Sequence, residues 1–400
     1  MLIKNCRLTD REGLVDILIE DGKITKVEVG IQYDGEVIEA AGKDVLPGMI
    51  DVHTHMREPG MTHKETIETG SMACAKGGIT TYVDMPNTNP ATITVKALEE
   101  KRKLSEEKSI VNFGFNFGGS LDNNSAEIKV ATEEKNIVAT KVFLNISTGK
   151  MLIENDEVLG DIFEASDKVM VHAEGMMVQK AIDFAKRYNK KLYLCHISQE
   201  SELELVREAR KDYSEIYVEV TPHHLFLSLD DQTQRLRMKP ELKPKADVDA
   251  MWKAIEEGMI DTIGTDHAPH TLEEKDANIT FGIPGIETAM PLMLDAVNSG
   301  RLTLAKLVDM YSAKPAKIFD LAGKGRIEVG YDADIIIVDM EKEYILRNKE
   351  IVSRCGWTPF DGKEVKGMVE TTIVNGNVVY NANNENKFNK IIGREVKING

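Results

Sequence analysis

Two histidines spaced two residues apart form the clearest chemical motif in this chain. They occur in residues 49–60, MIDVHTHMREPG, where an apolar lead-in predicts a buried strand. Side chains at positions i and i+2 of a strand share a face, so His53 and His55 can bind one metal ion together. Arg57 follows two residues later and could receive an anion beside that metal. The alternative is a polar strand end with two solvated histidines.

Four later residues could complete a metal site, and each has a simpler explanation when taken alone. His172 and His196 could be buried core histidines, and Asp266 could cap a helix. Four imidazoles and a carboxylate around one cavity, however, bind divalent metals well, zinc first. The sequence therefore predicts a metal centre with these ligands: His53, His55, Lys141, His172, His196 and Asp266.

Lys141 differs from the others because an ammonium group cannot bind metal. Ala139, Lys141 and Phe143 share one strand face, so Lys141 can point inward. A lysine shielded from water can lose its proton, and the neutral amine can take up carbon dioxide to form a carbamate. That anion could bridge two metals roughly 3.5–4 Å apart. The alternative is a lysine that extends to solvent.

The predicted chemistry is hydrolysis of an amide or ring amide, or the reverse reaction. Two metals would turn a bridging water into hydroxide near neutral pH and would polarise the scissile carbonyl. Asp266 could take a proton from the hydroxide as a base. It could then deliver a proton to the leaving nitrogen as an acid.

Alternating strand and helix patterns would position these residues. Helical stretches such as 174–188 and 200–211 separate eight strand-like runs, which predicts a (β/α)8 TIM barrel. In that fold the catalytic residues lie at the C-terminal strand ends, where the predicted ligands fall. The strand-like runs are 49–55, 78–84, 110–117, 138–144, 168–172, 191–196, 216–221 and 261–265.

The two ends of the chain contain short alternating strands and tight turns at Asp21-Gly22 and Asn375-Gly376. Neither end alone makes a convincing core. We therefore expect residues 1–48 and 325–400 to form one small composite β-sandwich, with the barrel, 49–324, inserted between them.

Composition excludes several classes of function. The chain has 400 residues and a net charge of −16, which argues against nucleic-acid or membrane binding by bulk charge. No apolar run approaches the roughly 18 residues of a membrane span, and the N-terminus lacks a signal-peptide core. The four cysteines contain no CxxC pair, which predicts a reducing cytoplasm.

Several long motifs resemble those of the dihydroorotases of the amidohydrolase superfamily. They are DVHTHMREPG, KETIETGSMACAKGGITTYVDMPNTNP, TPHHLFLS, GTDHAPHTLEEK, FGIPGIET, GYDADIIIVD and SRCGWTPFDGKEVKG, and together they span most of the chain. The resemblance implies reversible interconversion of N-carbamoyl-L-aspartate and L-dihydroorotate in de novo pyrimidine biosynthesis. It also implies two Zn²⁺ ions per subunit and an N6-carboxylated Lys141.

The resemblance further implies a set of substrate contacts. Arg57, Asn87 and His270 would hold a carboxylate, with Arg57 acting as a bidentate fork. Backbone groups of Phe281 and Gly282 would line the ring. Lys239 stands where relatives carry Arg or Asn, which leaves its contact with the carboxylate open.

The residue types themselves leave milder alternatives open for some of these contacts. Asn87 could simply shape a turn between prolines, Gly282 could be a loop hinge, and Lys239 could be solvated. His63, on the loop after the first strand, could be a surface residue.

Two other functions compete with this one. An allantoinase or hydantoinase would share the barrel and metals, but allantoinase-like sequences resemble HVHFNEPG, with Asn where this chain has Arg57. A non-catalytic scaffold homologue would lack metal ligands.

The sequence raises further expectations that it does not decide. An extra metal could bind near Glu219 and His223, and residues 145–150 could close over substrate as a lid. The chain is expected to form a homo-oligomer and could associate with an aspartate transcarbamoylase.

Substitution of Lys141 tests the bridging ligand. Lys141→Ala should lose the bridging metal, because no carbamate can form, and small carboxylic acids should partly restore it. Metal content would be measured by elemental analysis. Wild-type metal content in the variant would point to a different bridging ligand.

Overall fold

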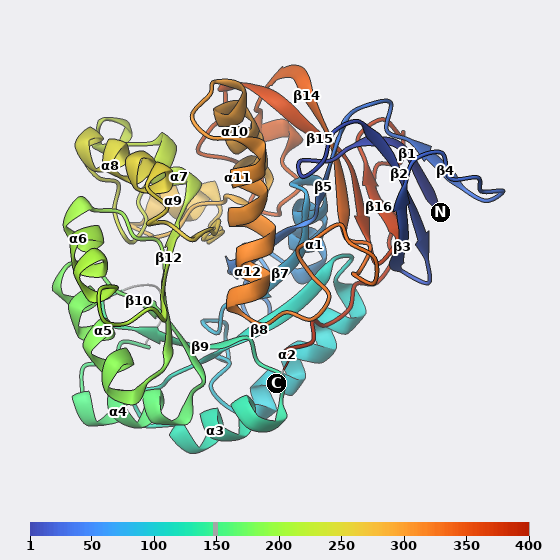
Figure 1. Ribbon diagram of the computed structural model, residues 1–400. Helices are drawn as coiled ribbons and strands as arrows, with labels where there is room; N and C mark the ends of the chain where they lie inside the picture. The colour runs from blue at the N-terminus through green and yellow to red at the C-terminus, as the bar shows by residue number, and fades with distance from the viewer. Residues whose placement is uncertain (147–150, 400) are drawn as a thin grey trace.

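A ring of eight parallel strands forms the middle of the chain (Figure 1), which confirms the predicted barrel. The structure is a computed structural model that describes residues 1–146 and 151–399. Neighbouring strands pair in chain order from β6 to β13. Their bounds are β6 (Met49–Thr54), β7 (Ile79–Asp84), β8 (Asn112–Gly118), β9 (Ala139–Phe143), β10 (Lys168–His172), β11 (Lys191–Leu194), β12 (Ile216–Val220) and β13 (Thr262–Ile263).

The seam between β13 and β6 closes mainly through a side chain. The buried carboxylate of Asp51 accepts hydrogen bonds from the backbone N–H of Thr265 at 3.2 Å and from its hydroxyl at 2.5 Å. Just past the end of β6, the N–H of His55 donates to the carbonyl of His267 at 2.8 Å. These bonds bring the segment after β13 against the end of β6.

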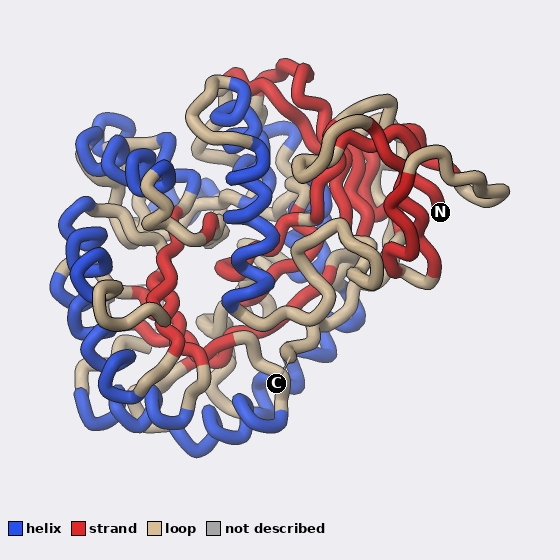
Figure 2. The backbone as a smooth tube through the Cα atoms, viewed as in Figure 1, coloured by secondary structure: helices blue, strands red, loops and turns tan. Residues whose placement is uncertain are grey.

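Helices surround the barrel (Figure 2), and the longer ones pack an apolar face against it. In α5, residues Val178, Ala181, Ile182 and Ala185 recur at helical spacing and are buried. The bounds are α1 (Ile67–Lys76), α2 (Val95–Lys108), α3 (Ser125–Glu134), α4 (Asp156–Ala165), α5 (Met176–Tyr188), α6 (Glu200–Ala209), α7 (Pro222–Phe226), α8 (Lys245–Glu256), α9 (Leu272–Ala277), α10 (Ile286–Asn298), α11 (Leu304–Val308) and α12 (Lys314–Ile318). Within the described ranges, no helix has the length and hydrophobicity to cross a membrane.

Both ends of the chain meet in one separate sheet, as expected, and most of its strand pairs are antiparallel. Antiparallel pairing of β5 with β14 joins the two ends, and a core rich in isoleucine lies against this sheet. The sheet order is β16-β15-β14-β5-β1-β2-β3, with β4 paired to β1. The bounds are β1 (Leu2–Arg7), β2 (Leu14–Glu20), β3 (Lys23–Glu28), β4 (Val37–Glu39), β5 (Asp44–Pro47), β14 (Ile335–Ile345), β15 (Glu364–Val374) and β16 (Asn377–Asn381). The predicted domain boundaries stay a prediction.

The two predicted hairpin turns are present and touch each other. Asp21 and Gly22 have φ of 52° and 78°, and Asn375 and Gly376 have φ of 49° and 76°. Positive φ at both central residues is the geometry of a type I′ turn. A Cβ at Gly22 would lie 2.9 Å from the carbonyl oxygen of Asn375, so this contact requires glycine.

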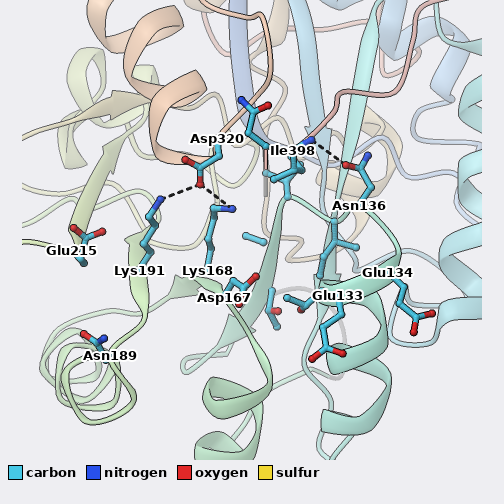
Figure 3. Close-up of a pocket in the computed structure, with 16 residues that line it drawn as sticks. Glu133, Glu134, Asn136, Asp167, Lys168, Asn189, Lys191, Glu215, Asp320 and Ile398 are labelled. Atoms are coloured by element: carbon cyan, nitrogen blue, oxygen red, sulfur yellow. Dashed lines mark hydrogen bonds and ion pairs between the residues drawn. The ribbon is translucent and has the colours of Figure 1, made fainter.

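A cavity of about 650 Å³ lies at the N-terminal ends of the barrel strands, opposite the predicted ligands. Figure 3 shows the side chains that line it. The cavity is lined by residues at the starts of β9, β10 and β11, including Lys168 and Lys191, whose ammonium groups lie 3.2 Å and 3.0 Å from one carboxylate oxygen of Asp320. The tail closes this end, where the N–H of Ile398 donates to Asn136 at 3.1 Å. Because barrel enzymes react at the C-terminal strand ends, this cavity is not the active site.

A buried polar cluster joins the sheet to the barrel. The carboxylate of Asp334, beside β14, accepts bonds from Lys324 at 2.6 Å, from the side-chain amide of Asn112 on β8 at 2.9 Å, and from the N–H of Asn375 at 2.8 Å. Asn375 in turn donates to Asn112 at 2.7 Å. The carboxylate therefore holds three segments that are distant in the chain.

Removal of this carboxylate should weaken the whole fold. Asp334→Ala leaves the ammonium of Lys324 buried beside one remaining carboxylate, a change that costs about 3–5 kcal/mol in comparable sites. The measurement is the midpoint of thermal unfolding. Asp10→Ala removes a carboxylate from an exposed ion pair and should leave the midpoint unchanged.

Candidate active site

Four predicted ligands converge at the C-terminal end of the barrel. The Nε2 atoms of His53 and His55 lie 3.2 Å and 3.1 Å from the same Asp266 carboxylate oxygen. One ligand atom each from His53, His196 and Asp266 lie within 4.8 Å of one another. All four side chains are buried, although they come from three different strand ends.

His172 and His196 form the other side of this cluster. Nδ1 of His172 faces Nε2 of His196 at 2.9 Å. The outer nitrogen of each ring, Nε2 of His172 and Nδ1 of His196, is buried and has no hydrogen-bond partner among the described residues. Burial lowers the pKa of both imidazoles, so the rings are neutral and offer lone pairs.

Lys141 lies in the same buried region. Its side chain is fully buried, and its ammonium group donates to the Cys195 sulfur at 2.9 Å and lies 5.1 Å from the centre of the Phe143 ring. In the described part of the chain, no carboxylate comes within ion-pair distance of this amine. A buried amine without an anionic partner fits a lysine that carries its own negative charge as a carbamate.

Two acceptors orient the first pair of histidines. Nδ1 of His53 donates to Glu219 at 2.8 Å, and Nδ1 of His55 donates to the side-chain oxygen of Asn87 at 2.6 Å. Glu219 is itself held by the N–H of His196 and the hydroxyl of Tyr193, each at 2.9 Å. With Nδ1 protonated, each Nε2 presents its lone pair toward Asp266. Hydrogen-bond acceptors fix the tautomer and the orientation of metal-binding histidines in this way.

The donor set therefore fits a divalent metal. Burial lowers the pKa of His53 to about 3 and that of His55 well below its usual value, so both rings are neutral. Neutral imidazoles with a carboxylate suit borderline ions. The number of ions, the identity of zinc and the carboxylation of Lys141 stay predictions.

A cationic group lies beside the histidines. Arg57 is 2% exposed, its Nε donates to the carbonyl of Pro269 at 3.1 Å, and one terminal nitrogen lies 3.4 Å from Nε2 of His270. His270 also lies 3.1 Å from the carbonyl of Phe281, whose ring is 5.1 Å from the Lys239 ammonium. The structure thus gathers Arg57, Lys239, His270 and Phe281.

Asn87 makes a contact that the sequence did not predict. Its side-chain oxygen accepts a hydrogen bond from Nδ1 of His55 at 2.6 Å, so Asn87 orients this ring. Its predicted contact with a substrate carboxylate stays a prediction.

Gly282 occupies a position that only glycine can fill. Its φ is 129°, and a Cβ there would lie 2.5 Å from the carbonyl oxygen of Ala268. The loop is anchored by Lys275, whose buried ammonium donates to the carbonyls of Arg237, Thr280 and Gly282 at 2.8–2.9 Å. Sequence reasoning missed Lys275, because a lysine in the polar stretch of α9 resembles a surface residue.

Three residues of the site have left-handed backbone conformations. Arg57, His196 and Asp266 have φ of 60°, 37° and 43°, a region that side chains other than glycine seldom adopt. Such conformations cost free energy and persist where the surrounding structure holds them for function.

The remaining expectations fare unevenly. One atom each of His53, Cys195 and Glu219 lie within 4.8 Å of one another, and His223 has a buried Nε2 without a hydrogen-bond partner among the described residues, so an extra metal stays a prediction. The neighbouring His224, which is not among the predicted site residues, uses both ring nitrogens in hydrogen bonds, with the hydroxyl of Thr221 and the carbonyl of Pro240. Most of the predicted lid, 147–150, lies outside the described residues.

Comparison with known proteins defines the class. The amidohydrolase family model matches residues 45–379, and the chain belongs to this family. It is 35% identical to the dihydroorotase of Methanosphaera stadtmanae, covering 97% of this chain and 98% of that one. It is 38% identical to the dihydroorotase of Pyrococcus furiosus, with 92% and 89% covered. Among solved structures, the L-hydantoinase (dihydropyrimidinase) of Arthrobacter aurescens superposes with a TM-score of 0.92 at 29% identity, with 99% of each chain covered.

Substitution of Glu219 tests the orienting contact. Glu219→Gln replaces the carboxyl group that accepts from His53 with an amide, so the variant should bind metal about 10–100-fold more weakly. Competition with a chelator would measure this, with circular dichroism as a check on folding. Unchanged metal affinity would remove Glu219 from the metal centre.

Proposed function

We propose that the protein catalyses the reversible conversion of L-dihydroorotate and water to N-carbamoyl-L-aspartate. The observation that carries this function is a pair of cations, the buried Arg57 and the partly exposed Lys239, which lie with His270 beside the histidine cluster. A ring amide that bears a carboxylate needs metal ligands for the amide and cations for the carboxylate. The dihydroorotases named above, similar over nearly their full length, support the same assignment.

The ligands His53, His55, Lys141, His172, His196 and Asp266 would hold the metal. When bound, divalent metal lowers the pKa of water and polarises a carbonyl. Carboxylated Lys141 and two zinc ions are the form we expect for this site.

Asp266 is the proposed proton carrier. In the hydrolytic direction a C–O bond forms at the ring carbonyl and the C–N bond breaks. Asp266 takes one proton from the attacking water and returns it to the departing nitrogen. The second water proton is released when the new carboxylic acid ionises.

The cationic group would bind the substrate carboxylate. Burial lowers the pKa of Arg57 to about 10, so its guanidinium remains charged at neutral pH. Out of water, a charged hydrogen bond to a carboxylate is strong and directional. Phe281 and Gly282 would line the ring, and Lys239 would add a second cation.

A hydantoinase is the second candidate, favoured by the close superposition with the Arthrobacter aurescens enzyme. Hydantoins and dihydropyrimidines with an uncharged ring have no anionic group for the two cations, Arg57 and Lys239, to bind. The complete ligand set argues against a non-catalytic scaffold.

The four cysteines are buried and unpaired, which supports a reducing compartment such as the cytoplasm. Self-association and a complex with an aspartate transcarbamoylase stay predictions.

One purified sample tests the function. Turnover of dihydroorotate would be compared with that of hydantoin, allantoin and dihydrouracil, alongside metal stoichiometry. Dihydroorotate should have the highest kcat/KM, with stoichiometric metal. Preference for an uncharged ring would assign the protein to the hydantoinases instead.

Replacement of Asp266 tests the proton carrier. Asp266→Asn should retain metal but lose turnover by about 10²–10⁴-fold, because the amide cannot accept the proton. Rates would be measured in both directions. A rate near that of the wild type would exclude this role.

A further inference from the structure

Lys64 lies next to the proposed carboxylate-binding group, on the loop between β6 and α1. Its ammonium group is 3.2 Å from Nδ1 of His270 and 3.2 Å from a carboxylate oxygen of Glu274. The side chain is 13% exposed. Neither the ligand set nor the predicted substrate contacts include this residue.

The neighbours of His270 define how its ring is protonated. Nε2 lies 3.1 Å from the carbonyl oxygen of Phe281, which can only accept, and 3.4 Å from a terminal nitrogen of Arg57, which can only donate. The carbonyl is the closer partner, so Nε2 carries a hydrogen. Burial, together with the charges of Arg57, Lys64 and Lys275, lowers the pKa of His270 to about 3. The ring is therefore neutral, and Nδ1 must be the acceptor. An ammonium group can only donate, so Lys64 matches this state.

Glu274 makes the opposite demand on the same nitrogen. Its second carboxylate oxygen lies 3.4 Å from Nδ1 of His270, and a carboxylate would favour a hydrogen there. That tautomer would leave Nε2 as an acceptor facing the carbonyl of Phe281, and it would repel a substrate carboxylate. Lys64 and Glu274 thus compete for one atom, and Lys64 is closer.

We propose that Lys64 is a positioning residue that holds His270 as its Nε2–H tautomer, so that the nitrogen beside Arg57 is a donor for the substrate carboxylate. This inference rests on the proposed function. It deepens that function by naming the residue that sets the polarity of the carboxylate-binding group.

Two measurements on Lys64→Met test the proposal. KM for dihydroorotate should rise about tenfold, while kcat should stay within threefold, because the contact serves binding. Nitrogen-15 NMR of the His270 ring, assigned with His270→Ala, should show the hydrogen on Nε2 in the wild type and on Nδ1 in the variant. Lys64→Arg keeps a cationic donor and should keep the wild-type tautomer and KM.

His63→Ala is the matched control. The exposed His63 lies 3.1 Å from the same Glu274 oxygen and does not appear among the contacts of His270. Its KM should stay within twofold of the wild type. An equal rise in this control would mean that Lys64 acts only by anchoring Glu274, which would overturn the proposal.

A double-mutant cycle separates indirect from direct action. In a His270→Ala background, Lys64→Met should add nothing further to KM, because Lys64 acts through the ring. Additive effects would make Lys64 a direct substrate contact instead, and an unchanged tautomer in Lys64→Met would equally refute the proposal. Lys64→Ala replaces the methionine variant if that one does not fold.

The outcomes also distinguish the inference from the function. A wild-type protein without dihydroorotate turnover would overturn the proposed function, whereas the NMR result on the free protein would still decide which tautomer Lys64 selects. Normal wild-type turnover with an unchanged KM in Lys64→Met would overturn the inference alone.

Discussion

Closure of the barrel between β6 and β13 is the constraint on which the site depends. His53 and Asp266 are more than two hundred residues apart, and their side chains meet because the Asp51 carboxylate ties Thr265 to the end of β6. The same carboxylate accepts the N–H of His53 at 3.1 Å. A buried carboxylate must satisfy its hydrogen-bonding capacity inside the protein, so this seam is specific as well as tight.

A second constraint comes from the far end of the chain. The segment between β14 and β15 reaches the barrel mouth, where Ser353 donates to the buried carboxylate of Glu65 and Trp357 donates to the carbonyl of His270 at 2.8 Å. Glu65 also lies 3.3 Å from Nε2 of His267, the residue after Asp266. This segment thus supports the loop that carries Asp266 and also His270, which gives the SRCGWTPFDGKEVKG motif a physical role.

Burial divides the site into a neutral half and a charged half. Around the proposed metal ligands, removal of water keeps the imidazoles neutral, as metal binding requires. Around Arg57 the same removal of water strengthens attraction to a carboxylate. One substrate can meet both demands if it carries a hydrolysable amide and a carboxylate a few bonds apart.

The sequence by itself determined the repeating pattern of strands and helices and the identities of the candidate metal ligands. Strand and helix periodicity are local properties, so all eight barrel strands and both type I′ turns could be predicted within a few residues. The histidines and Asp266 could be named because strand ends of a barrel share one face. Only the tertiary structure decided which groups orient them. The orienting contacts join residues that are 32 to 206 positions apart in the chain: Glu219 with His53, Asn87 with His55, and Lys64 with His270. No local pattern encodes such pairs, because their distances exist only once the ring of strands has closed.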